Sequence, residues 1–487
     1  MICVSIYQES RRLALVDMLN AAGQADLLEV RLDRFGKAPD IGELLAARPK
    51  PVIMSCRRPS DGGAWDGREN ERIALLRQCI VSKADYVEIE HDIADQIRPF
   101  PPAKRVISYT NLRETPSDLQ EIYDGIRHRH ADVIKLVLPV RTPEETWPVL
   151  QLVQKTTVPT VVVGLGKPGV MLAILGRKLG APWVYAALEK GMEAYPGQVS
   201  VRELVTVYRY RDIGRETRFV GITGFSDLEA ALTAGLNEAL ARVPSALRCL
   251  PLPVGDERLF RKVMDAFRLH ALWVDQEHQA ALYTCVARAD KAAQFAAAAD
   301  FLVRAPDRSW HGYHLLSDAV CRVLQQGPAS QQTLSGRIVV VVGTGPLGKA
   351  LVYRLKQVGA LPIVAGRQRD ILQEIAQNAG CRYLLAEAIY STMHDVLIVA
   401  EAHAEARKAG EAPLHPGFLK PGMTVLDLSA LPRDTAFMDE ARQRGCTVCS
   451  PRAVVAALVE RAATILSGRS PASESVEAAL REALGDE

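Results

Sequence analysis

Residues 1–213 contain short apolar runs separated by polar, helix-forming stretches. The runs are rich in β-branched residues, which is typical of buried parallel strands. Eight of them occur here: ICVSI (2–6), ADLLEVRLD (25–33), PVIMSC (51–56), ADYVEIE (84–90), RVISYT (105–110), DVIKLVL (132–138), VPTVVVGLG (158–166) and PWVYAAL (182–188). Eight strands alternating with helices fit the length of a compact (β/α)8 barrel. We therefore predict that residues 1–213 form an α/β domain, a TIM barrel.

The rest of the chain has a different pattern. It starts with an apolar strand at RFVGITGFSD (218–227) and continues through Ala-rich amphipathic helices. The polar segment QQGPASQQTLSG (325–336) is predicted to be a hinge. Residues 337–370 then have the pattern of a strand, a glycine turn, a helix and a second strand, which is typical of a Rossmann domain. The predicted divisions are an α/β substrate domain over 217–330, a Rossmann domain over 331–450 and C-terminal helices over 451–487.

The glycine turn is the sharpest local signal. Gly343, Gly345 and Gly348 fit GxGxxG directly after a strand and at the start of a helix, where a pyrophosphate can approach the backbone. No acidic residue stands at the end of the second strand to bind a ribose 2′-hydroxyl. Arg367 stands there, with Arg369 close by, which favours NADP over NAD. In the alternative interpretation the glycines only form the turn and the arginines are solvated.

The amino-acid composition argues against nucleic-acid binding, membrane insertion and metal binding. The 487 residues carry 59 basic and 57 acidic side chains, a net charge of +2, and no basic run that would indicate nucleic-acid binding. No apolar segment has the length of a membrane span, and the N-terminus lacks a signal-peptide pattern, so we expect a cytoplasmic protein. Nine scattered cysteines are expected to be reduced thiols. Neither the histidines nor the single CxxC pair has ligand spacing, so no metal is predicted.

Five segments of the first domain carry a family resemblance: EVRLD (29–33), SCRRPSDGG (55–63), IKLVL (134–138), GKPGV (166–170) and YPGQVS (195–200). They resemble the type I 3-dehydroquinate dehydratases. Residues 217–487, through their glycine turn and C-terminal helix, resemble the shikimate dehydrogenases. The order of the two halves is that of fused, bifunctional proteins of the shikimate pathway, which make precursors of aromatic amino acids.

The resemblance implies roles for five residues of the barrel. Lys135 would be the Schiff-base lysine, and four side chains would line the substrate site: Glu29, Arg31, Arg57 and Gln198. A lysine that points into a barrel is costly to bury as a cation, so we expect its pKa to fall and its amine to become nucleophilic. The alternative is a lysine that extends to the barrel mouth and keeps its charge in water.

The barrel departs from the family pattern at four site positions. The family histidine that transfers protons is Thr110 here, and the glutamate before the two glycines is Asp61. The arginine that binds the substrate carboxylate falls on Ala173, and the serine before PGQ falls on Ala194. Loss of a general acid–base group commonly costs about 100- to 10,000-fold in rate. Arg177, one helical turn after Ala173, is a candidate to replace the missing arginine.

The dehydrogenase half departs further. Only Ser226 and Asn237 remain of the serine-rich substrate motif. Gln279 stands where the family has its catalytic lysine, and Leu458 stands where it has a substrate-binding glutamine. The family asparagine of the following loop falls on Asp300. WHGYHLLSDAV (310–320) keeps Gly-Tyr but not the Asn-Thr-Asp that follows it, although Asp318, two residues late, could serve after a shift.

Three hypotheses remain open at this point. The chain is a working shikimate-pathway enzyme that relies on Lys135, an NADP-binding pseudoenzyme or regulatory scaffold, or an enzyme of another Schiff-base or reductase chemistry. In each case we expect a monomer or homodimer that binds a small cyclic hydroxy or keto carboxylate and NADP, without nucleic acid, membrane or metal.

Overall fold

A computed structural model describes residues 1–37, 40–243, 245–326, 333–400 and 414–485. The chain divides into two compact units. The first consists of Met1–Thr217 with the short segment Pro251–Gly255, and the second of Arg218–Leu250 with Asp256–Glu487. The predicted hinge at 325–336 lies largely outside the described residues, and so does the predicted boundary between 330 and 331.

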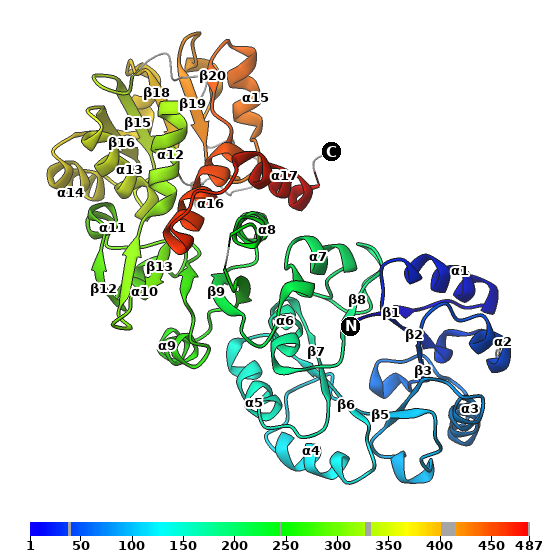
Figure 1. Cartoon of the computed structure of the whole chain (residues 1–487). Coiled ribbons are helices and arrows are strands. Elements are labelled where there is room, and N and C mark those ends of the chain that lie inside the picture. The colour runs from blue at the N-terminus through cyan, green and yellow to red at the C-terminus, as the bar shows by residue number, and fades with distance from the viewer. Residues whose placement is uncertain (38–39, 244, 327–332, 401–413, 486–487) are drawn as a thin grey trace. The chain divides into compact units, whose positions relative to one another are not determined.

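Eight parallel strands form the first unit, in the order β7-β6-β5-β4-β3-β2-β1-β8. Their bounds are β1 (Ile2–Ile6), β2 (Leu27–Arg31), β3 (Val52–Ser55), β4 (Tyr86–Glu90), β5 (Lys104–Thr110), β6 (Val133–Pro139), β7 (Thr160–Leu165) and β8 (Val184–Ala186). The strands follow one another around a ring, with helices outside it (Figure 1). This is the (β/α)8 barrel that the apolar runs predicted.

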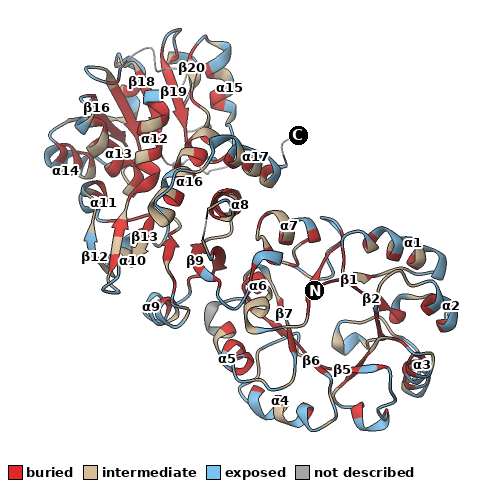
Figure 2. Cartoon of the chain, in the orientation of Figure 1, coloured by how far each residue is buried: buried red, intermediate tan, exposed pale blue. Residues whose placement is uncertain are grey.

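Helices surround the barrel, and the α-helices bury one face each (Figure 2). Their bounds are α1 (Arg11–Ala22), η1 (Leu32–Arg34), α2 (Ile41–Ala46), η2 (Pro59–Asp61), α3 (Glu69–Val81), η3 (Ala94–Gln96), α4 (Leu119–Arg127), α5 (Pro143–Val153), η4 (Lys167–Gly169), α6 (Val170–Leu179), α7 (Val201–Thr206) and η5 (Tyr210–Asp212). Side chains of Ser10, Asp40 and Ser200 cap α1, α2 and α7 by accepting backbone N–H bonds. The barrel interior is apolar near the amino ends of the strands and charged toward their carboxyl ends.

The second unit contains two sheets. The first is mixed, in the order β10-β9-β11-β13-β14-β12. Its strands are β9 (Arg218–Thr223), β10 (Leu247–Leu252), β11 (Ala271–Trp273), β12 (Val286–Ala289), β13 (Phe301–Arg304) and β14 (Trp310–Tyr313). The second sheet is parallel, in the order β17-β16-β15-β18-β19-β20. Its strands are β15 (Ile338–Val342), β16 (Leu361–Gly366), β17 (Arg382–Leu385), β18 (Val396–Val399), β19 (Thr424–Asp427) and β20 (Thr447–Val448). This second sheet is the expected Rossmann sheet.

The helices of the second unit are α8 (Asp227–Ala241), α9 (Glu257–Ala266), α10 (Gln279–Tyr283), α11 (Lys291–Ala296), α12 (Leu315–Gln326), α13 (Pro346–Gln357), α14 (Arg369–Ala379), η6 (Ala386–Ser391), η7 (Pro416–Phe418), α15 (Ala436–Gln443), α16 (Pro451–Ser467) and α17 (Ser473–Leu484). Both C-terminal helices, α16 and α17, pack on α8, and α16 also packs on α12. One apolar core therefore joins both sheets of this unit. Among the described helices, none is both long and apolar enough to span a membrane.

Candidate active site

A cavity of about 270 Å³ opens at the carboxyl ends of the barrel strands. All five residues that the resemblance placed at the substrate site line it: Glu29, Arg31, Arg57, Lys135 and Gln198. They come from β2, β6 and the loops after β3 and β8. In a (β/α)8 barrel this end of the strands is where active sites lie, so the position agrees with the predicted site.

Lys135 occupies the centre of the buried charges. Its Nζ lies 3.0 Å from Oε1 of Glu29 and 3.1 Å from Oε2 of Glu88, and the residue is 1% exposed. The Nζ also lies 4.0 Å from the ring centroid of Tyr185, on β8, in a cation–π contact. Lys135 therefore does not extend to the barrel mouth, because two carboxylates and an aromatic face hold its ammonium inside the barrel.

Arg57 contacts the same two carboxylates. Its Nη2 donates to Glu29 Oε1 at 2.7 Å and to Glu88 Oε2 at 2.9 Å, and Ser5 Oγ donates to Glu29 Oε2 at 2.5 Å. Burial favours the neutral form of Glu29, but Lys135, Arg57 and Arg31 outweigh it and hold the pKa of Glu29 well below its usual range. Two cations and two carboxylates thus compensate one another in the barrel interior.

Arg31 has a different partner. Its Nε and Nη2 donate to the two oxygens of Asp33 at 2.9 and 2.8 Å. Asp33 also accepts from the backbone N–H groups of Arg57 and Ala64. This bidentate pair fixes the loop after β3, so Arg57 enters the cavity from a rigid backbone.

The loops after β7 and β8 bring Gln198 to the cavity. Gly166 has φ +118° and donates its N–H to Pro196 O at 2.9 Å. Gly197 has φ +86°, and a Cβ there would lie 2.3 Å from the carbonyl carbon of Gly166. Both positions therefore require glycine, which explains the GKPGV and PGQ segments. Gln198 Oε1 accepts from the N–H of Ala194 at 2.7 Å.

The substituted family positions divide into two groups. Asp61 and Ala194 line the cavity, and Thr110 pairs in register with Val137, which also lines it. Ala173 instead lines a separate hollow beside α5, β7 and β8. The expectation that Arg177 replaces the missing arginine is not supported, because its Nε donates to Ile213 O at 3.2 Å and its guanidinium lies over Tyr210.

No histidine is among the residues that line the described cavity. The groups nearest to Nζ that can accept or donate a proton are Glu29, Glu88 and Tyr185. Glu88 Oε1 and the Tyr185 hydroxyl are buried without a hydrogen-bond partner among the described residues. Burial, with Glu29 nearby, raises the pKa of Tyr185 well above its usual value, so its hydroxyl stays protonated. Sequence reasoning missed Glu88 and Tyr185, although an acidic residue on a buried strand was the available signal.

The glycine turn of the second unit has the geometry of a nucleotide loop. Gly343 has φ +140° and donates its N–H to Ala365 O, at the end of β16. A Cβ on Gly348 would lie 2.3 Å from Gly343 O, so glycine alone lets α13 pack this closely on β15. Arg367 follows β16 directly and is exposed beside this turn. Pro346 at the first position of α13 removes one N–H donor.

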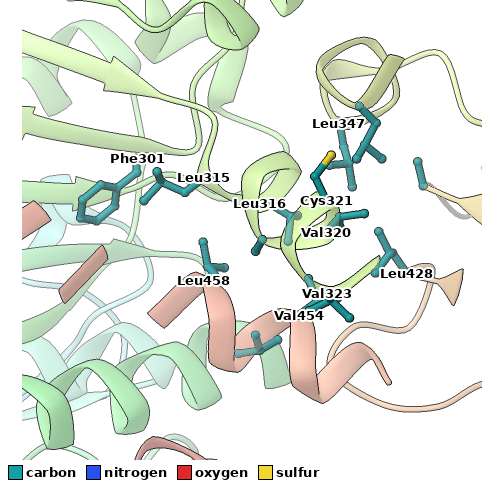
Figure 3. Packing of buried hydrophobic residues seen from close by; sticks show 14 of the residues in the cluster. Phe301, Leu315, Leu316, Val320, Cys321, Val323, Leu347, Leu428, Val454 and Leu458 are labelled. Atoms are coloured by element: carbon teal, nitrogen blue, oxygen red, sulfur yellow. The ribbon is translucent and has the colours of Figure 1, made fainter. Parts of the chain in front are cut away.

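Three of the positions at which the family has polar substrate groups hold leucines that pack into the core of this unit (Figure 3). After Gly312-Tyr313 the family has Asn-Thr-Asp, whereas this chain has His314, Leu315 and Leu316. Both leucines and Leu458, at the position of the family glutamine, belong to the buried cluster that also contains Phe301. Gln279 is buried and donates to Val274 O at 3.3 Å.

Asp318, the candidate for the missing catalytic role, is already paired with two arginines. It forms ion pairs with Arg354 at 3.3 Å and Arg461 at 3.5 Å. Asp300 accepts the N–H groups of Leu315 and Leu316 and so caps α12. Burial raises the pKa of Asp300 to about 7.

The two remnants of the serine-rich motif have structural contacts as well. Ser226 caps α8, and Asn237 Oδ1 accepts from Cys249 N.

The comparisons with known proteins agree with this architecture. The family described as Type I 3-dehydroquinase matches residues 2–215. The bifunctional 3-dehydroquinate dehydratase/shikimate dehydrogenase of Arabidopsis thaliana is 26% identical over 451 residues, covering 88% of this chain and 75% of the relative. The 3-dehydroquinate dehydratase of Methanopyrus kandleri is 33% identical over 186 residues, covering 37% of this chain and 84% of the relative.

The second unit has a structural relative of its own. A shikimate dehydrogenase solved in complex with NADP+ matches 55% of this chain and 96% of its own length, with 17% identity and a TM-score of 0.50. This likeness concerns the fold. The chain belongs to the type I 3-dehydroquinase family through its barrel, which is fused to a unit with the fold of a shikimate dehydrogenase.

Proposed function

We propose that the barrel forms a Schiff base between Lys135 and a cyclic keto carboxylate of the 3-dehydroquinate type, and then removes water from it. The observation that carries this proposal is the buried Nζ at the base of the cavity, between the carboxylates of Glu29 and Glu88. The Arabidopsis and Methanopyrus relatives are named for this dehydration, which supports the choice of substrate.

The chemistry needs only groups that are present. Nζ must pass a proton to an adjacent carboxylate before it attacks the keto carbon, and loss of one water then gives the imine. The imine acidifies the neighbouring C–H, a carboxylate removes that proton, and the hydroxyl on the next carbon leaves as water after protonation. Water finally hydrolyses the imine and restores the lysine. Because Thr110 cannot act as a base, we expect turnover about 100- to 10,000-fold below that of an enzyme with histidine there.

For the second unit we propose NADP(H) binding without oxidation of shikimate. The glycine turn at the start of α13 and the adjacent Arg367 support binding. The apolar side chains of Leu316 and Leu458 at the family substrate positions argue against turnover. A regulatory or scaffolding role of this unit is the alternative to a reductase with another substrate. A cytoplasmic location remains part of the proposal.

Borohydride reduction tests the proposed Schiff base. Incubation of the full chain with 3-dehydroquinate and borohydride should give one covalent adduct per chain, detected by mass spectrometry. Lys135→Ala should abolish it. The matched control is Lys104→Ala, because Lys104 also lies over a tyrosine ring, Tyr86, but is exposed at the start of β5. Absence of an adduct from the wild type over a broad panel of keto acids would contradict the proposal.

A further inference from the structure

Four cationic side chains line the barrel cavity, and three of them are neutralised. Arg57 and Lys135 share Glu29 and Glu88, and Arg31 is paired with Asp33. The fourth is Arg34, the last residue of η1. Its guanidinium lies 5.9 Å from the ring centroid of Tyr7, and no carboxylate of the described residues lies within ion-pair distance of it. The cavity therefore contains one cation whose charge is not compensated.

Arg34 stands where a ligand can reach it. It is exposed at the end of the η1 turn that follows β2, and it also lines an adjoining hollow of about 310 Å³. The two hollows share Ser5, Tyr7 and Ala194. The carboxylates of the second hollow have other partners, because Asp17 accepts from Gln8 and Glu193 accepts from the N–H of Gly191.

A keto carboxylate adds a negative charge to a cavity whose buried charges already balance. A carboxylate that enters without a cation loses hydration and gains nothing in return. The family positions that would bind it do not supply a partner here, since Ala173 lines another hollow and Ala194 has no hydroxyl. A planar guanidinium is the best match for a carboxylate because it can donate two parallel hydrogen bonds.

We propose that Arg34 binds the carboxylate of the substrate and so replaces the arginine that the family carries at position 173. This inference rests on the proposed Schiff-base function of the barrel. The keto carbon then lies over Lys135 Nζ while the carboxylate lies at the mouth of the cavity, between Arg34 and the loop that contains Ala194. Arg34 thereby selects keto acids over uncharged ketones.

The test compares two probes that differ only in charge, 3-oxocyclohexane carboxylate and its carboxamide. Half-saturating concentrations are measured by borohydride trapping with the wild type, Arg34→Ala and Arg34→Lys. The control is Arg68→Ala, because Arg68 is exposed and pairs with Glu71 outside the cavity. Arg34→Ala should raise the half-saturating concentration of the carboxylate about 10- to 100-fold, as expected for the loss of a charge-assisted contact, and leave that of the carboxamide unchanged. Arg34→Lys should give an intermediate value, because the bidentate geometry is lost.

Two results would overturn the inference. One is an equal effect of Arg34→Ala on both probes, which indicates a structural role, and the other is no effect on either. If the wild type traps neither these probes nor any keto acid of the broad panel, the Schiff-base proposal fails, and calorimetric binding of the carboxylate without borohydride still tests Arg34. In that measurement, unchanged affinity of Arg34→Ala for the carboxylate contradicts the inference, and a loss of about tenfold or more supports it.

Discussion

The barrel and the dehydrogenase-like unit both lack family residues, but they differ in what occupies the lost positions. In the barrel the substituted positions Asp61 and Ala194 line the cavity, Ala173 lines a separate hollow, and the charged centre of Lys135, Arg57, Glu29 and Glu88 is present. In the second unit Leu315, Leu316 and Leu458 occupy three of the lost positions and pack into the core. The first region remains able to carry out polar chemistry, whereas the second has become part of the hydrophobic interior.

This difference has an energetic meaning. Burying a charged group costs several kcal/mol, and the attraction between partners often only compensates for it, so a buried ion cluster is weak evidence of stabilisation. Well-packed apolar side chains stabilise a fold directly, by roughly 1.5–3 kcal/mol for a fully buried leucine. A charged cluster that opens on a cavity is thus better explained by function than by stability. The leucine-rich interior of the second unit is explained by stability alone.

The largest expected effect comes from restoring the barrel. Thr110→His, Asp61→Glu and Ala194→Ser together should raise dehydration of 3-dehydroquinate about 100-fold or more, because they return an acid–base group beside an intact lysine. Formation of the conjugated product is followed by ultraviolet absorbance. Single changes should do little, since residues that act as a unit are not additive.

Adding Ala173→Arg to that triple variant is the control. It should give no further gain, because Ala173 lines a different hollow from Lys135. A folded triple variant with wild-type activity would mean that the barrel serves another reaction.

The barrel and the Rossmann sheet could be predicted because buried parallel strands form apolar runs and a nucleotide loop has a fixed glycine spacing. The five cavity residues were reached through the resemblance of short segments to a known family. Glu88 and Arg34 were missed because their significance depends on which strands and turns the folded barrel brings together. Arg177 was misjudged because helical spacing places it near Ala173, whereas the packing of α6 turns both away from the cavity. The apolar cluster around Leu316 depends on long-range packing and has no local pattern.

The second prediction applies the same kind of repair to the other unit. Leu316→Asp returns a carboxylate to the family position, but it should lower the free energy of unfolding by about 3–5 kcal/mol, since the charge has no partner there. Chemical denaturation followed by circular dichroism measures this. Leu316→Met, which conserves volume, should cost less than about 1.5 kcal/mol. A stable Leu316→Asp protein that oxidises shikimate would remove the contrast between the two units.

The third prediction concerns pH and the barrel cluster. The pKa of Glu29 is well below its usual range in the folded state, so the unfolded chain takes up a proton first as the pH falls. The stability contributed by Glu29 is therefore complete above about pH 5 and declines below it. Lys135→Met removes the cation that lowers this pKa most. The free energy of unfolding of this variant should therefore fall less steeply with decreasing pH than that of the wild type, by up to about 1.4 kcal/mol per pH unit for one proton. Urea unfolding from pH 7 to 3.5 checks the slopes, with Lys104→Met as the control. Parallel slopes for Lys135→Met and the wild type would show that Lys135 does not govern Glu29.

The smallest expected effect concerns the nucleotide site of the second unit. The question is whether this site still binds NADP(H) although leucines stand at three of the family's substrate positions. The backbone N–H groups and the dipole at the start of α13 should hold the pyrophosphate of either nucleotide, and Arg367 should pair with the 2′-phosphate that only NADP carries. Fluorescence titration should therefore give tighter binding of NADP(H) than of NAD(H), by about tenfold. Arg367→Ala should erase that preference by weakening NADP(H) alone, and Arg382→Ala, an exposed arginine at the start of β17, serves as the control. Neither nucleotide should support oxidation of shikimate, because Leu316 and Leu458 replace two polar groups of the family's substrate site. Equal affinities of the wild type for the two nucleotides would contradict the role of Arg367. If neither nucleotide binds, the second unit has lost its nucleotide site as well, and a scaffolding role remains for it.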